Sequence, residues 1–353
     1  MSVLFEPFPQ RSLRLRNRIV VSPMCQYSSV DGLPDDWHLV HLGSRAVGGA
    51  AVVFTEASAV SPEGRISPDD AGLWSAGHAD AWSSIARFIA ARGAIPAVQL
   101  AHAGRKASTF APWKGDGAVA VVDGGWTPDA PSAIAFNDKY PMPQALGDAR
   151  IAKVRADFRS AAQYALDAGF RIVELHAAHG YLLHQFLSSL SNARTDAYGG
   201  SFENRTRLLR ETVSAIREVW PESLPLWLRI SATDWVEGGW DIEQSVELCR
   251  GLSALGVDLV DVSSGGLSPL QKIPIAPGYQ VPFAARIRGE ASIATGAVGL
   301  ITEPAQAERI VADGDADVVL LAREFLRDPY FPRRAAKALN AEIQSPQQYL
   351  RSW

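Results

Sequence analysis

Short apolar runs recur along this chain, and a glycine precedes five of them. The runs are rich in Val, Ile and Leu and do not alternate with polar residues, which is typical of parallel strands buried on both faces. Glycine tolerates the left-handed conformation that ends many helices, so each glycine is expected to close a helix just before a strand. The five units are Gly48-Gly49 with 50–55, Gly93 with 94–100, Gly169 with 170–175, Gly256 with 257–262 and Gly314 with 315–321.

Three further apolar runs, residues 18–22, 224–230 and 291–295, bring the predicted strands to eight. Eight strands alternating with helices predict an α/β fold of the (β/α)8 or TIM-barrel class, a single domain over residues 1–353. A doubly wound sheet is the alternative, but it does not need eight units, and no G-x-G-x-x-G follows a strand. The helical spacing between strands is clearest at Val154, Phe158, Ala162 and Ala165, and at Leu209, Val213, Ile216 and Trp220.

Residues 101–147 interrupt this pattern after the third strand with many Gly, Pro and Trp residues. The segment is too long for an ordinary connection. Two interpretations remain open: a loop that covers the active face, or a surface insertion with its own small hairpin.

Composition narrows the classes of function. The chain has 353 residues, 47% of them hydrophobic, and a net charge of −4, which favours neither nucleic acid nor an anionic membrane as partner. Its two cysteines, Cys25 and Cys249, cannot form a disulfide framework or a four-thiolate cluster, so a cytoplasmic location is expected. The first residues lack a secretion signal, and no apolar run approaches the ~18 residues of a membrane span.

Unusual polar and small residues follow each predicted strand, and the carboxyl ends of barrel strands meet on one rim where barrel enzymes react. We therefore expect these residues to share one site. In strand order they are Ser22-Pro23-Met24-Cys25, Glu56-Ala57, Gln99 and His102, His176 with His179 and Tyr181, Arg229, Ser263 to Gly266, Thr295 to Gly299, and Ala322-Arg323.

The last two loops predict a phosphate site. Small residues such as Gly296 and Gly299 allow backbone N–H groups to approach an anion, and Arg323 adds charged donors. The alternative is that the glycines serve turns and that Arg323 forms a salt bridge at the start of a helix.

Arg229 interrupts an apolar strand, and a buried arginine needs an anion. The anion is either the N1–C2 edge of a reduced flavin or an internal carboxylate, Glu174 or Asp261. Gln99 leaves a similar choice between a flavin pyrimidine edge and a core hydrogen-bond network.

His176, His179 and Tyr181 are candidates for two oxyanion donors and one general acid, since a phenol of pKa about 10 stays protonated at neutral pH. Zinc would need a third ligand, and no nearby pattern supplies it, so no metal is expected. Structural histidines and a core tyrosine remain the alternatives. Cys25 is either a small buried hydrophobe or a thiol at a redox centre.

Four motifs resemble the Old Yellow Enzyme family, and Cys25 followed by Tyr27 resembles its thermophilic-like bacterial ene-reductases, the NADPH dehydrogenase or xenobiotic reductase subclass. The resemblance covers nearly the whole chain. The motifs are Ser22 to Tyr27, Gln99 to Lys106, Glu174 to Leu182 and Asn192 to Arg205.

The resemblance implies a (β/α)8 barrel that binds FMN non-covalently, takes electrons from NADPH or NADH, and reduces the activated C=C bond of enones, enals or maleimides. It implies that His176, His179 and Tyr27 bind substrate and that Tyr181 donates the proton. A terminal Arg351 would reach a neighbour's site, so residues 340–353 would lie at the interface of a homodimer or homotetramer. The implied flavin contacts are Ser22, Pro23, Met24, Cys25, Ala57, Gln99 and Arg229, and the implied phosphate contacts are Gly296, Ala322 and Arg323, with Ala322 where the family usually has glycine.

Two rival functions are distinguishable. A dihydrouridine synthase-like RNA reductase would need a basic RNA-binding surface and usually has an extra domain. The net charge and the length of this chain favour neither feature. A non-catalytic flavin-binding protein would be yellow without alkene-dependent turnover.

Overall fold

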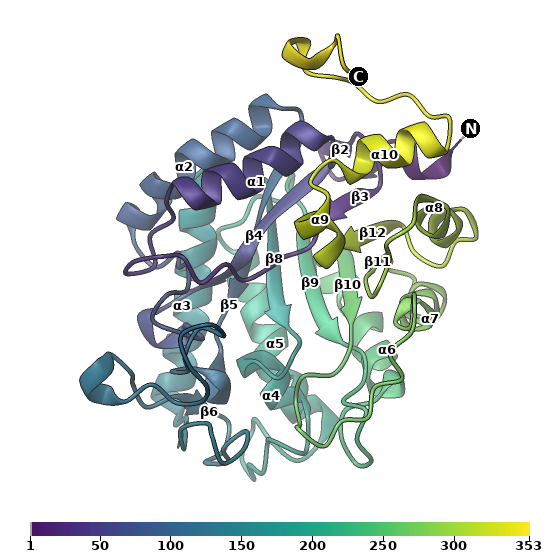
Figure 1. Ribbon diagram of the computed structural model, residues 1–353. Helices are drawn as coiled ribbons and strands as arrows, with labels where there is room; N and C mark the ends of the chain where they lie inside the picture. The colour runs from purple at the N-terminus through teal and green to yellow at the C-terminus, as the bar shows by residue number, and fades with distance from the viewer. Residues whose placement is uncertain (1) are drawn as a thin grey trace.

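The computed structural model describes residues 2–353, and its centre is a closed barrel of eight parallel strands. The strands pair in chain order, and the last pairs with the first, which confirms the predicted (β/α)8 class. Figure 1 shows the barrel inside a layer of helices. The barrel strands are β3 Ile19–Val21, β4 Val52–Ala59, β5 Ile95–Ala101, β8 Ile172–Ala177, β9 Leu226–Ser231, β10 Leu259–Ser263, β11 Ala294–Ala297 and β12 Val318–Leu321.

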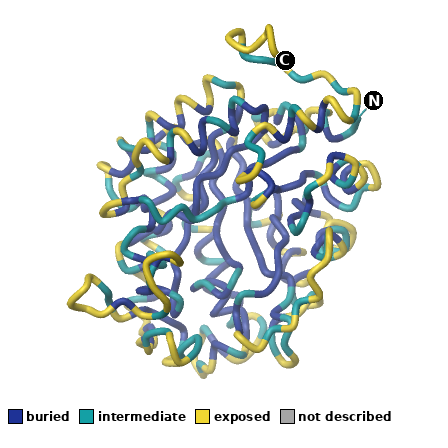
Figure 2. The backbone as a smooth tube through the Cα atoms, in the orientation of Figure 1, coloured by how far each residue is buried: buried dark blue, intermediate teal, exposed yellow. Residues whose placement is uncertain are grey.

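The helices lie where apolar spacing predicts them. Val154 and Phe158 are buried on α3, and Leu209 and Val213 are buried on α5. The apolar faces cover the strands, while the outer faces are exposed (Figure 2). The helices are α1 Asp36–Gly48, α2 Ala76–Ala91, α3 Asp148–Asp167, α4 Leu182–Leu187, α5 Phe202–Arg217, α6 Ile242–Arg250, α7 Val281–Ala291, α8 Pro304–Ala312, α9 Arg323–Arg327 and α10 Phe331–Ala338.

The glycines that precede strands adopt the expected left-handed backbone, with φ between 76° and 105° at Gly49, Gly93, Gly169, Gly256 and Gly314. The seventh strand begins later than predicted. Residue 291 ends α7, and Ser292 follows it in a left-handed conformation with φ 52°. β11 therefore runs from Ala294 to Ala297 instead of over residues 291–295.

A hairpin closes the barrel at the end where the strands begin, and the apolar pattern of the sequence does not reveal it. Its antiparallel strands are β1 Phe8–Gln10 and β2 Leu13–Leu15. Leu15 packs with Val20, Phe54 and Trp227 inside the barrel. Gln10 Oε1 accepts a hydrogen bond of 3.0 Å from the Trp227 indole, which satisfies a buried donor.

The segment after β5 holds two 3-10 turns, Gly104–Lys106 and Val121–Asp123, and two short strands, β6 Asp129–Ala130 and β7 Gln144–Ala145. The two strands pair in parallel, so they do not form a hairpin with each other. The first turn of the segment lies beside the end of β8, since Lys106 Nζ lies 5.4 Å from the centre of the Tyr181 ring.

Among residues 2–353, no helix has both the length and the apolar character needed to cross a membrane.

Candidate active site

Three aromatic side chains meet where β8 ends. The ring centres of His176 and His179 lie 5.2 Å apart, and those of His176 and Tyr181 lie 4.9 Å apart, in each case with nearly perpendicular planes. His176 is the penultimate residue of β8, and Tyr181 is the N-cap of α4. One strand end therefore supplies two imidazoles and a phenol within one cluster.

Backbone contacts define the ring of His176. Its Nδ1 accepts a hydrogen bond of 3.2 Å from the Ala178 N–H, so the ring proton lies on Nε2, which is left as a donor. Burial and the charge of Arg229 lower the pKa of His176 well below 6.5. The same two causes lower the pKa of His179, so both imidazoles are neutral at pH 7.

Tyr181 is half-buried beside a cation. Burial raises its pKa well above 10, and the nearby Cys25 and Tyr27 raise it further. The phenol therefore keeps its proton at neutral pH. Lys106 Nζ donates to the carbonyls of His179 and Gly266, each at 3.0 Å, and burial lowers the pKa of Lys106 to about 8.

The loop after β3 lies beside this cluster. Tyr27 adopts a left-handed backbone with φ 49°, and its ring contacts that of Trp113 edge-on at 5.7 Å. The Gln26 N–H between Cys25 and Tyr27 donates to Glu56 Oε2 at 2.9 Å. Burial, followed by the Asp70 and Glu56 carboxylates, raises the pKa of the Cys25 thiol well above 9. Cys25 is therefore a protonated thiol.

Ala57 occupies an irregular position of its strand. The register of β4 against β5 shifts between Phe54 and Ala57, and such irregularities re-aim side chains near active sites. Ala57 and Tyr181 line the same small cavity of about 10 Å³, which brings the ends of β4 and β8 together.

Buried charges line the barrel interior next to the histidines. Arg229 Nε lies 3.0 Å from Asp261 Oδ2, so the internal carboxylate expected as one alternative is present. The geometry of this contact is not that of a hydrogen bond, and both atoms are left without a hydrogen-bond partner. Gln99 Nε2 donates to Glu174 Oε1 at 2.8 Å, which matches the core-network alternative. Burial raises the pKa of Asp261 to about 6, although Arg229 opposes the shift.

A cavity of about 190 Å³ opens between the ends of β11 and β12. Ala322 and Arg323 line it, as do Gly299 and Ser263. Arg323 forms no ion pair with any carboxylate among residues 2–353, unlike Arg327 and Arg334, which both contact Glu324. The salt-bridge alternative for Arg323 is therefore not what the structure shows.

The structure corrects the expected position of Gly296, which was placed in the loop after the seventh strand. Because β11 extends to Ala297, Gly296 lies within the strand, and a Cβ there would come within 2.4 Å of Leu320 Cδ1 in the barrel core. It does not line the cavity. Gly299, with φ 123°, lies on the cavity instead.

These features fit a flavin mononucleotide. A basic cavity with a free arginine suits the phosphate. Ser22 Oγ and Arg229 Nε are buried polar atoms without a hydrogen-bond partner among residues 2–353; Ser22 directly follows β3, and Arg229 lies on β9. Such atoms are costly unless another group satisfies them. Pro23, Met24 and Cys25 are half-buried directly after β3.

Some candidates remain outside this cluster. Residues 344–346 pack beside Arg16 and Gly93, which precede β3 and β5, and Figure 1 shows the C-terminal tail far from β6. Arg351 is therefore not near the site of its own chain.

Within residues 2–353, no three His, Cys, Asp or Glu side chains are arranged to hold a metal ion.

Two contacts to the cluster were not predicted. Lys106 stands in one of the quoted motifs but was given no role. Ser263, which was expected at the site without a stated partner, is the last residue of β10, and its Oγ lies 2.7 Å from His179 Nε2. Both contacts join residues that follow different strands, so only the folded structure shows them.

The fold and this site together define a flavin-dependent oxidoreductase built on an α/β barrel. A sequence profile of the NADH:flavin oxidoreductase / NADH oxidase family matches residues 3–342. The NADPH dehydrogenases of Bacillus velezensis and Bacillus subtilis are 47% and 45% identical to this chain, each over 99% of both sequences.

Solved structures agree with the sequence matches. Morphinone reductase bound to tetrahydroNAD superposes with a TM-score of 0.78 at 28% identity, covering 98% of this chain and 92% of that chain. A 2-naphthoyl-CoA reductase superposes with a TM-score of 0.86 at 27% identity, covering 95% of this chain but 52% of that longer chain. The protein belongs to the NADH:flavin oxidoreductase / NADH oxidase family, that of the Old Yellow Enzymes, as an FMN-dependent NADPH dehydrogenase.

Proposed function

We propose that the protein reduces the activated C=C bond of α,β-unsaturated carbonyl compounds such as enones, enals and maleimides. The observation that carries this proposal is the cluster of His176, His179 and Tyr181, which combines two neutral imidazoles with a protonated phenol. FMN, when bound, supplies a two-electron carrier that takes hydride from NADPH and delivers it to carbon.

The imidazoles serve as donors to the substrate carbonyl. His176 presents Nε2–H, since its Nδ1 already accepts the Ala178 N–H. The Ser263 hydroxyl lies 2.7 Å from His179 Nε2 but 3.3 Å from Gln280 Oε1. Donation to the closer atom leaves the proton of His179 on Nδ1. Two fixed N–H groups then face the oxygen on which charge develops as hydride reaches Cβ, an effect typically worth ~3–4 kcal/mol per donor.

Tyr181 completes the reaction by protonating Cα. Its raised pKa keeps the proton available across the neutral range. Tyr27, next to Trp113, lines the substrate side with aromatic surface. Cys25 would contribute a neutral, polarisable thiol to the flavin site.

A visible spectrum of the purified protein followed by anaerobic NADPH and then cyclohexenone tests this function. We expect a yellow protein that is bleached by NADPH and recovers its colour with cyclohexenone. Recovery with oxygen but not with any activated alkene would refute ene-reduction while leaving the NADPH dehydrogenase intact.

We also propose that Arg351 enters the site of a neighbouring subunit in a homodimer or homotetramer. The tail lies at the end of the barrel where the strands begin, opposite the site at their carboxyl ends in the same chain. Removal of residues 341–353 should lower the molecular mass in light scattering and raise the KM for cyclohexenone. A truncated protein with unchanged mass and KM would remove the tail from this role.

A further inference from the structure

A third histidine, His184, lies on α4 directly behind the reactive cluster. It is fully buried, and its Nδ1 accepts a hydrogen bond of 2.9 Å from the Gly180 N–H. An imidazole nitrogen that accepts cannot carry the proton, so the proton lies on Nε2. His184 Nε2 lies 2.9 Å from Asp234 Oδ1, so the neutral N–H lies beside the carboxylate, although it is not aligned on that oxygen.

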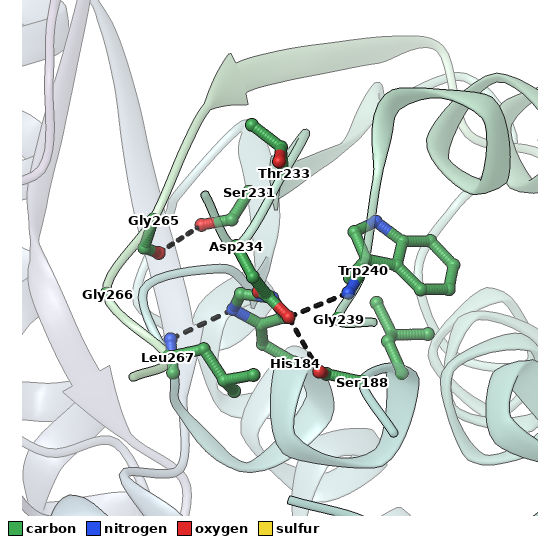
Figure 3. Close-up of polar contacts among 12 residues, drawn as sticks. His184, Ser188, Ser231, Thr233, Asp234, Gly239, Trp240, Gly265, Gly266 and Leu267 are labelled. Carbon is green, nitrogen blue, oxygen red and sulfur yellow. Dashed lines mark hydrogen bonds and ion pairs between the residues drawn. The ribbon is translucent and has the colours of Figure 1, made fainter. Parts of the chain in front are cut away.

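Asp234 is itself held from two further sides. Its Oδ2 accepts from the Ser188 hydroxyl at 2.6 Å and from the Trp240 N–H at 2.8 Å, and Figure 3 shows both donors converging on this oxygen. Burial raises the pKa of Asp234, but the neighbouring His184 side chain and these donors outweigh burial and lower it overall. The carboxylate is therefore ionised although it is fully buried.

The backbone that His184 holds is strained. His179 and Gly180 both adopt left-handed conformations, with φ 57° and 74°. A left-handed backbone is uncommon for a residue with a side chain and persists only where its surroundings impose it. The side chain of Gln185 accounts for the Gly180 carbonyl, donating to it at 2.7 Å. His184 and Gln185 thus satisfy the backbone N–H and the backbone carbonyl of Gly180, the residue between His179 and Tyr181.

We propose that His184, backed by Asp234, is a positioning residue that fixes the turn at Gly180 and thereby sets the His179 donor and the Tyr181 acid relative to each other. The proposal rests on the proposed alkene reduction. It concerns only the step in which the reduced enzyme transfers hydride and a proton to the alkene, not the reduction of the enzyme by NADPH. Electron delivery to an acceptor that needs neither donor nor acid should not depend on His184.

The test compares His184→Leu with His184→Asn in the FMN-loaded enzyme. Leucine removes the acceptor for the Gly180 N–H. Asparagine keeps an oxygen two bonds from Cβ, where His184 has Nδ1, and so keeps the acceptor. Each variant is reduced with NADPH under anaerobic conditions, and its reoxidation by cyclohexenone and by ferricyanide is followed by stopped flow.

We expect His184→Leu to slow cyclohexenone-driven reoxidation about 10- to 100-fold, the usual cost of a small misplacement of reacting groups. Its ferricyanide-driven rate should match the wild type. His184→Asn should restore the cyclohexenone rate to within about 3-fold, since it loses only the contact with Asp234. His78→Asn is the matched control, because His78 is also buried but bonds Ser75 and the Asp31 carbonyl at the start of α2.

Three results would overturn the proposal: an unchanged cyclohexenone rate in His184→Leu, an equal loss with both oxidants, or no recovery in His184→Asn. Absence of cyclohexenone turnover in the wild type would instead refute the proposed function. If His184→Leu does not fold, nitrogen NMR of the wild type with labelled histidine decides the matter. A proton bound to His184 Nδ1 would exclude its role as acceptor.

Discussion

Replacement of Tyr181 by phenylalanine isolates the proton-transfer step, because it removes one oxygen and little else. The contacts of Tyr181 with His176 at 4.9 Å and with Lys106 Nζ at 5.4 Å are made by the ring, so phenylalanine keeps them. The free energy of unfolding should therefore change by no more than about 1 kcal/mol. A positioned general acid contributes about 10²- to 10⁴-fold in rate, which corresponds to roughly 3–5 kcal/mol of barrier.

The expected change in the reaction barrier is larger than the expected change in the free energy of unfolding, so one set of measurements can distinguish a loss of proton transfer from a loss of stability. Stopped-flow absorbance should show that NADPH reduces the flavin of Tyr181→Phe at nearly the wild-type rate. Reoxidation by cyclohexenone should slow by at least about 100-fold, while the thermal midpoint stays within about 2 °C. A variant that retains cyclohexenone reoxidation within a factor of about three would show that another group or water supplies the proton, and Tyr181 would lose its assigned role.

Three further predictions concern the cofactor, the histidines and the thiol. Arg323→Ala should weaken FMN binding by at least about 10-fold in fluorescence titration, since a charged hydrogen bond is lost, whereas Ala322→Gly should leave it within about twofold because the backbone N–H remains. Burial and a nearby arginine charge lower the pKa of His176 and His179, so both rings stay neutral and the KM for cyclohexenone should not vary between about pH 6 and 8. A midpoint near 6.5 in that profile would contradict these shifts. Burial and two neighbouring carboxylates raise the pKa of Cys25, so iodoacetamide at about pH 8 should alkylate it at least about 10-fold more slowly than free cysteine, and fast labelling would show a thiolate.

The barrel itself was predictable because its signal is local. A helix-ending glycine followed by a fully apolar run specifies each unit without knowledge of its neighbours, and all five such glycines are left-handed in the structure. The hairpin of β1 and β2 was missed because its strands have three residues each, too few for a periodic pattern. Gly296 was misplaced for a related reason: Ser292 ends α7 in a left-handed conformation that usually marks glycine.

The reactive cluster was predictable for a different reason. His176, His179 and Tyr181 come within six residues after one strand, and barrel topology alone assigns them to the reactive rim. The alternatives for Arg229 could not be decided from sequence, because Asp261 is 32 positions away and becomes its neighbour only through the pairing of β9 with β10.

The residues that hold the reactive loops likewise become neighbours only when consecutive barrel units pack together. His184 meets Asp234 across two consecutive barrel units, and His38 Nε2 meets Glu56 Oε1 at 3.0 Å between α1 and β4. In each pair one member accepts a loop N–H: His184 that of Gly180 between His179 and Tyr181, and Glu56 that of Gln26 between Cys25 and Tyr27. Because a buried pair is costly to break from one side, loop geometry is tied to the folding of the whole barrel. Substitutions that remove the acceptor for either loop N–H should therefore alter turnover, even though none of these side chains is assigned a contact with substrate.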